Sequence, residues 1–329
     1  MKSSETSRYV EDKFYSTHNH LVEEREHKYF ERNKQTHKIH ERNQIRNISY
    51  NPSGDILSYH SGGNLVSFNI HDKTFFYSTL PKLVDFKYLQ KNTIVYSETN
   101  KNELKYYSTY DNCILRKFTG VTNKINHFDV DDVNDYVLGI SDNEAALWDM
   151  RCVNPILKVN KNENMHLGCL SNSNTFVLAT NDSISLFDIR NYKMSFDKYV
   201  QPNFYREISF FSNDSKLLMK TENSYYFYSE DFELKTFITL ENKNSGAITP
   251  GGKNLLCCSK NYVFSYLVDS RKKVDLIDLG NSNHTIRVSP AGDQFVAAGD
   301  NNITFVNWEG WRWYYGLDCY SRFYENNKQ

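Results

Sequence analysis

An all-β fold, a seven-bladed β-propeller, is predicted by three features of this 329-residue sequence. One pattern occurs twice in succession, first over His127–Arg151 and again over His166–Arg190. Similar repeats recur along the chain at intervals of about 37 to 43 residues, within or close to the spacing of propeller blades. Aromatic residues make up 15% of the chain, and with the β-branched residues they favour pleated, half-buried strands over helices.

Each of the two copies has the local sequence of a blade. Two short apolar runs are separated by Asp, Asn or Ser turns, and a third run ends in an aromatic residue, an Asp, an apolar residue and an Arg. These endings are Trp148, Asp149, Met150 and Arg151 in the first copy, and Phe187, Asp188, Ile189 and Arg190 in the second. A Trp-Asp pair that closes the third strand is typical of a WD repeat.

The repeats also set the predicted domain limits. Blades are expected to start near residues 46, 83, 126, 165, 206, 245 and 284, which places the propeller over 36–308. The alternating segment 36–41 is predicted to be a strand that completes the last blade, because a closed ring leaves no free sheet edge. Six or eight blades are the alternatives to seven.

Two segments lie outside the repeats. Residues 1–35 are predicted to form a charged helical extension that either lies against the propeller or docks a partner. The tail 309–329 is dense in aromatic residues, which seldom remain solvated. Trp311 and Trp313 in this tail are expected either to pack against the propeller or the N-terminal helix, or to anchor a partner.

Charge and composition exclude several classes of protein. The net charge is -1 and the pI is about 6.8, so there is no global basic field to drive nonspecific nucleic-acid binding. No apolar run approaches the roughly 18 residues of a membrane span, and the N-terminus lacks a signal-peptide core, so a soluble nuclear or cytoplasmic protein is expected. The six cysteines include no C-x-x-C pair and are expected to be reduced thiols, mostly in the core.

No catalytic, cofactor or metal site is expected. The His18-x-His20 and His37-x-x-His40 pairs lack a Cys or carboxylate at the usual ligand spacing. The sequence contains no G-x-S-x-G, P-loop, H-E-x-x-H or kinase motif. A binding protein is therefore predicted rather than an enzyme.

The first candidate partner-binding residues are the Asp149–Arg151 and Asp188–Arg190 endings, with Trp148 and Phe187 before them. Strand alternation places the Asp and the Arg of each ending on one face and the aromatic residue on the other. In one interpretation the Asp braces a turn and the Arg closes a blade edge. In the other, the endings resemble the docking box by which WD-repeat substrate receptors bind the adaptor of the cullin-four ubiquitin ligase.

A second candidate is a group of basic residues in the second and third repeats. It contains Lys101, Lys105, Arg116, Lys117 and Lys124, with Tyr106, Tyr107 and Tyr110 nearby. Lys105, Arg116 and Lys117 are the residues expected to grip a phosphorylated Ser/Tyr-rich peptide through charge-assisted hydrogen bonds. The alternative is an ordinary solvated surface.

One stretch carries a family resemblance. NTIVYSETNKNELKYYSTYDN, which begins at Asn92, continues through ILRKFTG to ALWDMR and resembles the Swd-two family of WD-repeat proteins, as does SLFDIRNY in the next repeat. The resemblance covers roughly Ile45 to Trp308 and is strongest between Leu83 and Arg190. Gly120-Val121 stands where the family has Gly-His, and most other repeats lack Trp-Asp.

The resemblance implies a nuclear function without catalysis. Members of the family are subunits of the COMPASS-type methyltransferase of histone H3. In some lineages they also serve the cleavage and polyadenylation factor, or a phosphatase complex at transcription termination. The family is linked to recognition of the phosphorylated C-terminal repeat of RNA polymerase II. A scaffold within such a complex is therefore expected, with protein partners such as a SET-domain methyltransferase, and with no membrane or sequence-specific nucleic-acid contact. A ligase substrate receptor and another RNA-processing scaffold are the alternatives.

Overall fold

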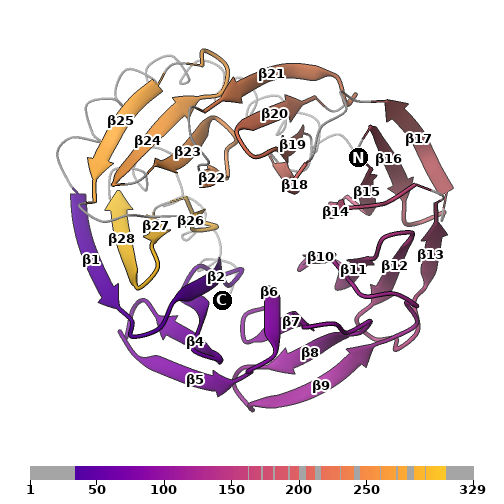
Figure 1. Ribbon diagram of the computed structural model, residues 1–329, viewed down its shortest axis with the longest axis horizontal. Coiled ribbons are helices and arrows are strands. Elements are labelled where there is room, and N and C mark those ends of the chain that lie inside the picture. Colours follow the sequence, from indigo (N-terminus) through magenta and orange to yellow (C-terminus); the bar gives the residue numbers. More distant parts are fainter. Residues whose placement is uncertain are drawn as a thin grey trace, which may run out of the picture.

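A computed structural model describes residues 34–308, apart from 162, 172, 181, 192, 200–204, 212–215, 230, 241–244, 260, 272, 280–284 and 293. The predicted helical extension and the predicted aromatic tail, with Trp311 and Trp313, lie outside this range. In the described part, β-strands form seven four-stranded antiparallel sheets arranged in a ring (Figure 1). The seven-bladed all-β propeller predicted from the repeats is confirmed.

The chain adds one blade after another around the ring, and each blade runs from an inner strand to an outer strand. Blade 1 contains β2 (Ile45–Tyr50), β3 (Ile56–Ser61), β4 (Asn64–Asn69) and β5 (Phe75–Thr79). Blade 2 contains β6 (Leu83–Gln90), β7 (Thr93–Glu98), β8 (Leu104–Ser108) and β9 (Cys113–Phe118). Blade 3 contains β10 (His127–Asp131), β11 (Tyr136–Ile140), β12 (Glu144–Asp149) and β13 (Leu157–Asn160).

The remaining blades follow the same plan. Blade 4 contains β14 (Leu167–Ser171), β15 (Thr175–Ala179), β16 (Ser183–Asp188) and β17 (Lys193–Tyr199). Blade 5 contains β18 (Glu207–Phe211), β19 (Lys216–Lys220), β20 (Ser224–Tyr228) and β21 (Leu234–Thr239). Blade 6 contains β22 (Ser245–Ile248), β23 (Asn254–Ser259), β24 (Tyr262–Leu267) and β25 (Lys273–Asp278). Blade 7 contains β26 (Thr285–Val288), β27 (Gln294–Ala298), β28 (Asn302–Trp308) and, as its outer strand, β1 (Lys34–His40).

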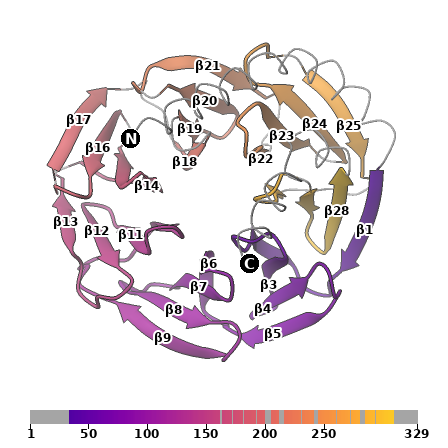
Figure 2. The ribbon, with the colours of Figure 1, turned by 180° about the vertical axis from the view of Figure 1, so that it is seen from behind.

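The two ends of the described chain meet in blade 7. β1 pairs antiparallel with β28 over its whole length, from Lys34 opposite Trp308 to His40 opposite Asn302. Figure 2, seen from behind, shows β1 filling the outer position of this blade beside β28. The first strand therefore joins the last sheet, and hydrogen bonds in that sheet close the ring.

The core consists of clusters packed between neighbouring sheets. The largest side chain among them, Trp148 of blade 3, lies in a cluster with Phe118 and Leu104 of blade 2. Gly139 on β11 lies directly under this ring, because a Cβ added there would come within 2.9 Å of Trp148. A residue without a side chain is thus required where the Trp ring packs.

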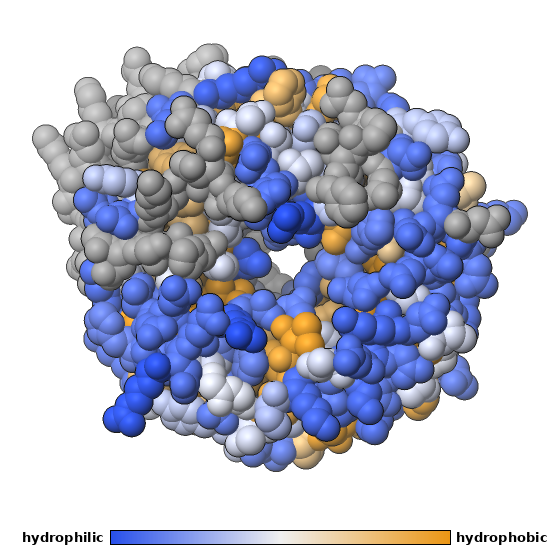
Figure 3. All heavy atoms as spheres, in the orientation of Figure 1, coloured by the Kyte–Doolittle hydropathy of each residue, from blue (hydrophilic) through white to orange (hydrophobic). Residues whose placement is uncertain are grey.

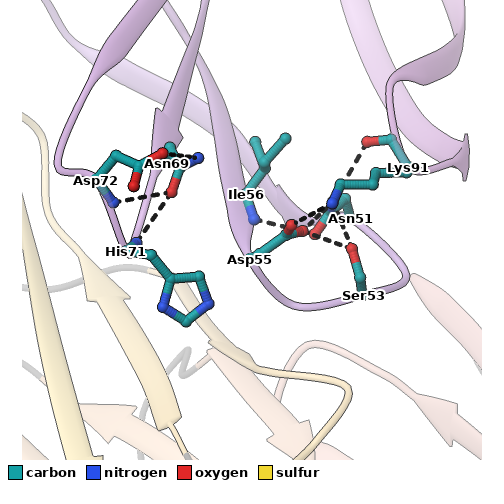
Figure 4. Close-up of polar contacts among 8 residues, drawn as sticks. All are labelled: Asn51, Ser53, Asp55, Ile56, Asn69, His71, Asp72 and Lys91. Atoms are coloured by element: carbon teal, nitrogen blue, oxygen red, sulfur yellow. Dashed lines mark hydrogen bonds and ion pairs between the residues drawn. The ribbon is translucent and has the colours of Figure 1, made fainter.

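Polar side chains form the turns that follow the inner strands. In blade 1, Asn51 Oδ1 accepts the backbone N–H of Ile56 at 3.0 Å, and its amide donates to Asp55 at 2.6 Å (Figure 4). Lys91 from blade 2 pairs with the same Asp55 at 2.8 Å. Burial disfavours the charged carboxylate, but the bonds from Lys91, Ser53 and Asn51 outweigh it and hold the pKa of Asp55 well below its usual range. This turn therefore also links two blades.

The same position caps the turn in other blades. Asp131 accepts the N–H groups of Val133 and Asn134, and Ser289 accepts that of Gln294. Figure 4 also shows Asn69 capping the next turn of blade 1, where its side-chain oxygen accepts the N–H groups of His71 and Asp72. The Asn, Asp and Ser residues between the apolar runs thus serve as turn caps.

The described cysteines are free. Cys169, Cys257 and Cys258 are buried, whereas Cys113 and Cys152 are exposed. Burial raises the pKa of the Cys258 thiol to about 11, so the buried thiol stays protonated. No helix capable of spanning a membrane is found among the described residues.

Candidate functional site

The third strands of blades 3 and 4 end in the same corner, built from an Asp and the Arg two residues later. Asp149 Oδ1 accepts hydrogen bonds from the backbone N–H and the Nε of Arg151, both at 2.8 Å, and Oδ2 accepts one from Nη2 at 2.5 Å. Asp188 holds Arg190 through the same three bonds, at 2.9, 3.1 and 2.9 Å. The repeated sequence therefore produces a repeated geometry.

Both corner carboxylates are held in the ionised form. Hydrogen bonding from Arg151 lowers the pKa of Asp149, and hydrogen bonding from Arg190 lowers the pKa of Asp188. The Arg151 and Arg190 side chains remain 77% and 71% exposed. Exposed pairs of this kind add little to stability. They do hold each guanidinium in one orientation, which leaves a planar, charged group presented to a partner.

Trp148 and Phe187, grouped with these corners in the sequence analysis, lie in the interior. Trp148 is 0% exposed, and its Nε1 donates to the carbonyl of Thr119 at 3.0 Å. Phe187 is buried and stacks on Phe176 with ring centroids 4.8 Å apart. A partner cannot contact either ring, so their contribution is to hold the strands that carry the corners.

Arg116 on β9 reaches the blade 3 corner from the neighbouring blade. Its Nη1 donates to the backbone carbonyl of Arg151. Its positive charge also contributes, after the stronger effect of Arg151, to the lowered pKa of Asp149. We call Arg116, Asp149 and Arg151 the blade 3 corner. Two guanidinium groups and one carboxylate give this corner a net charge of +1.

Lys105 and Lys117, predicted to act together with Arg116, are neighbours on adjacent strands but are already paired. They lie opposite one another in the β8–β9 register. Lys105 binds Glu98 at 2.7 Å with little exposure, and Lys117 binds Glu103 at 3.5 Å. Of the nearby tyrosines, Tyr106 and Tyr107 are buried and only Tyr110 is exposed. Each lysine charge is therefore matched by a carboxylate. Of the three predicted residues, it is the half-buried Arg116 that the structure brings to the blade 3 corner.

The inner strands surround a central channel with a volume of about 860 Å³. Figure 3 shows it as an open hollow at the middle of this face, bordered largely by hydrophilic residues. Corresponding positions of three inner strands supply Lys87, Asp129 and Arg287. Lys87 binds Asp129 at 2.7 Å, and the second oxygen of Asp129 accepts the backbone N–H of Leu170 at 2.8 Å. One carboxylate thus joins blades 2, 3 and 4.

A second ion pair lies on the blade 5 wall of the channel. Lys220 pairs with Glu207 at 3.5 Å. Burial works against the Glu207 carboxylate, but Arg287, Lys220 and Lys87 together outweigh it and lower the pKa of Glu207. Burial, with the positive charge of Lys87, lowers the pKa of His127 to about 4, so this imidazole is neutral at pH 7. The channel wall is therefore charged but internally compensated.

This channel network was not recognised in the sequence. Its signal was a charged residue between two apolar ones in the first strand of a repeat, as in Phe86-Lys87-Tyr88, which strand alternation places on the opposite face from its neighbours. Lys87, Asp129 and Arg287 all occupy that position. No cluster of three or more His, Cys, Asp or Glu residues able to hold a metal ion occurs within the described residues.

Comparisons with known proteins define the fold. No protein-family model matches the sequence, and no curated protein matches it closely enough to be a relative. Among solved structures, the chain is similar to one in a crystal structure of the mitotic checkpoint complex, with a TM-score of 0.68 and 10% sequence identity. That similarity covers 82% of this chain and 90% of the other. Together with the seven sheets and the β1–β28 closure, it shows that the chain has the fold of a seven-bladed β-propeller.

Proposed function

We propose that this protein is a noncatalytic interaction scaffold in a nuclear chromatin or transcription complex. The complex that best fits the Swd-two resemblance is a COMPASS-type histone H3 methyltransferase, or the machinery of mRNA 3′-end cleavage, polyadenylation and termination. A rigid ring with exposed, oriented charged groups suits the binding of several proteins at once. The similar solved chain also belongs to a multi-protein assembly, which supports an assembly role.

The blade 3 corner is the observation that carries the proposal. Its two guanidinium groups exceed its one carboxylate, and Arg151 is fixed in orientation yet largely exposed. Guanidinium groups match carboxylates and phosphates through paired hydrogen bonds. We therefore assign to this corner an acidic or phosphorylated segment of a partner, such as the phosphorylated repeat of RNA polymerase II.

Affinity purification of the tagged protein tests the partner class. Recovery of a SET-domain methyltransferase supports the methyltransferase complex, and recovery of a nuclease with poly(A) polymerase supports the processing complex. If neither partner is recovered, both assignments are wrong. Arg151→Gln is expected to weaken recovery of the partner that docks on the corner, whereas Arg42→Gln, an exposed arginine between β1 and β2, is the matched control.

Peptide binding tests the corner itself. We expect phosphorylated polymerase-repeat peptide to bind the wild type more tightly than unphosphorylated peptide. The double variant Arg116→Gln/Arg151→Gln should lose about 2 to 3 kcal/mol, because each charge-assisted hydrogen bond contributes about 1.5 to 3 kcal/mol and the two are not fully additive. Lys105→Gln/Lys117→Gln should bind nearly as wild type, since both lysines are paired with glutamates. Equal affinity for the two peptides would remove the phosphopeptide assignment.

The same geometry favours one second candidate, a substrate receptor of a cullin-four ubiquitin ligase. Two corners with the same Asp–Arg bonding stand in adjacent blades, and their sequences resemble the docking box of such receptors. Mixing the purified protein with the ligase adaptor distinguishes the candidates. A complex that is lost in Arg151→Ala/Arg190→Ala supports the receptor, and the absence of any wild-type complex eliminates it.

A further inference from the structure

The outer strand of blade 1 carries three consecutive exposed aromatic residues. Phe75, Phe76 and Tyr77 on β5 are 38%, 56% and 63% exposed. Phe75 and Tyr77 point to the same side of the strand, and their rings are stacked with centroids 6.4 Å apart. Aromatic surface grouped in this way normally contacts another part of a protein.

This pair continues into the interface between blades 1 and 7. Phe75 packs on Phe68 with centroids 4.8 Å apart, and Phe68 packs on Phe305 of β28 at 5.4 Å. Tyr77, Phe75, Phe68 and Phe305 thus form a continuous row of rings from the outer rim to the strand that closes the propeller. We call these four residues the aromatic row. Figures 1 and 2 both place β5 beside β1 at the rim, on either side of this interface.

The chain leaves the propeller next to the aromatic row. β28 ends at Trp308, three residues after Phe305, which corresponds to about 10 Å along a strand. The segment that follows, 309–329, contains Trp311, Trp313, Tyr314, Tyr315, Tyr320, Phe323 and Tyr324. Trp311 and Trp313 come three and five residues after Trp308, and an extended chain spans about 3.3 to 3.6 Å per residue, so both rings are within reach of the row.

The charge of the segment also suits an apolar contact. Its three acidic residues, Glu309, Asp318 and Glu325, balance its three basic residues, Arg312, Arg322 and Lys328, which gives a net charge of zero. Long-range electrostatic forces are therefore not expected to decide where the segment docks. Burial of its aromatic side chains is expected to decide it.

We propose that residues 309–329 dock their aromatic side chains, led by Trp311 and Trp313, on the aromatic row. The docked segment covers the interface between blades 1 and 7, where the ring is closed by β1 and β28. It removes the exposed rings of β5 from water and gives the last blade an additional contact with the first. This proposal is independent of the proposed function.

Site-specific photocrosslinking in the full chain tests the docking. A benzophenone amino acid replaces Tyr77 in one protein and Tyr199 in another. Tyr199 is 81% exposed on β17, the outer strand of blade 4 on the opposite side of the ring, and is the matched control. After irradiation, mass spectrometry of the monomer is expected to find crosslinks from position 77 to peptides of 309–329 and none from position 199.

Several results would overturn the proposal. The first is the absence of any crosslink from position 77 to 309–329, and the second is equal crosslinking from positions 77 and 199. The third is a crosslink from position 77 only to a second copy of the chain, in a covalent dimer. Trp311→Ser/Trp313→Ser is the second variant. Two lost aromatic contacts, each about 0.5 to 1.5 kcal/mol, should lower the crosslink yield from position 77 about tenfold. An unchanged yield would also refute the role of the two tryptophans.

Discussion

The contact between Gly139 and Trp148 gives a quantitative prediction about the core. A methyl group at position 139 would lie 2.9 Å from Cζ3 of Trp148, closer than carbon atoms pack, and 3.2 Å from Cη2, which is tighter than most such contacts. Gly139→Ala should therefore lower the free energy of unfolding by about 1 to 3 kcal/mol, the usual effect of overpacking. Trp148→Ala should lower it by about 3 to 5 kcal/mol, because it opens a large cavity.

The double variant distinguishes this steric explanation from a backbone effect. Without the indole ring the added methyl group has free space, so Gly139→Ala/Trp148→Ala should be more stable than the sum of the single effects predicts, by about 1 to 2 kcal/mol. Urea unfolding followed by tryptophan-independent far-UV circular dichroism measures all four proteins. Gly251→Ala is the control, since no atom lies within 4 Å of the added methyl group, and it should change stability by less than about 0.5 kcal/mol. Strict additivity, or an equal loss in Gly251→Ala, would refute the reasoning.

Three further predictions concern the central channel and the buried Trp148. The folded-state pKa of His127, about 4, lies below its unfolded value of about 6.5, so its contribution to stability is complete above pH 6.5 and declines as the pH falls toward 4. Urea unfolding at pH 7.5 and 5.5 should show a smaller loss for His127→Gln than for the wild type, and equal losses would contradict this. Asp129→Leu should destabilise the protein by about 3 kcal/mol, because it leaves Lys87 and the Leu170 N–H without their acceptor. Adding Lys87→Met should restore part of this loss. A double variant no more stable than Asp129→Leu would argue against the Lys87–Asp129 ion pair. Trp148→Phe removes the hydrogen bond to Thr119 but keeps a ring, as Phe187 does in blade 4, so denaturant unfolding should show a loss of about 1 to 2 kcal/mol, well below that of Trp148→Ala.

The sequence was informative wherever one repeat determines its own structure. The apolar runs predicted strands, Asn51 and Asp131 occupy turns that the Asn and Asp content predicted, and the Asp–Arg endings form corners of identical geometry. These features depend on residues only a few positions apart, so alternation and turn chemistry are sufficient to place them.

Contacts between repeats were not predictable in the same way. Arg116 contacts Arg151, and Lys87 contacts Asp129, across the interface between blades 2 and 3. Both contacts depend on how the two neighbouring sheets are oriented, which the sequence of a single repeat does not determine. Asn47 adopts a φ of 44° at a bulge in β2, where its side chain donates to the carbonyl of Val84 in the next blade. No periodicity in a single repeat indicates such a bulge. For this reason the lysine cluster was grouped with Arg116, although the structure pairs both lysines with glutamates.

The closure of blade 7 has a consequence for how this protein is made. During synthesis β1 leaves the ribosome before any other strand of the propeller, while its partner β28 is the last to emerge. Until then β1 has no complete sheet to join, and its hydrogen-bonding groups are available to other chains. Nascent molecules are thus vulnerable to misassembly until β28 has emerged. A bulky fusion placed directly before Lys34 should therefore lower the soluble yield more than the same fusion placed at the other end.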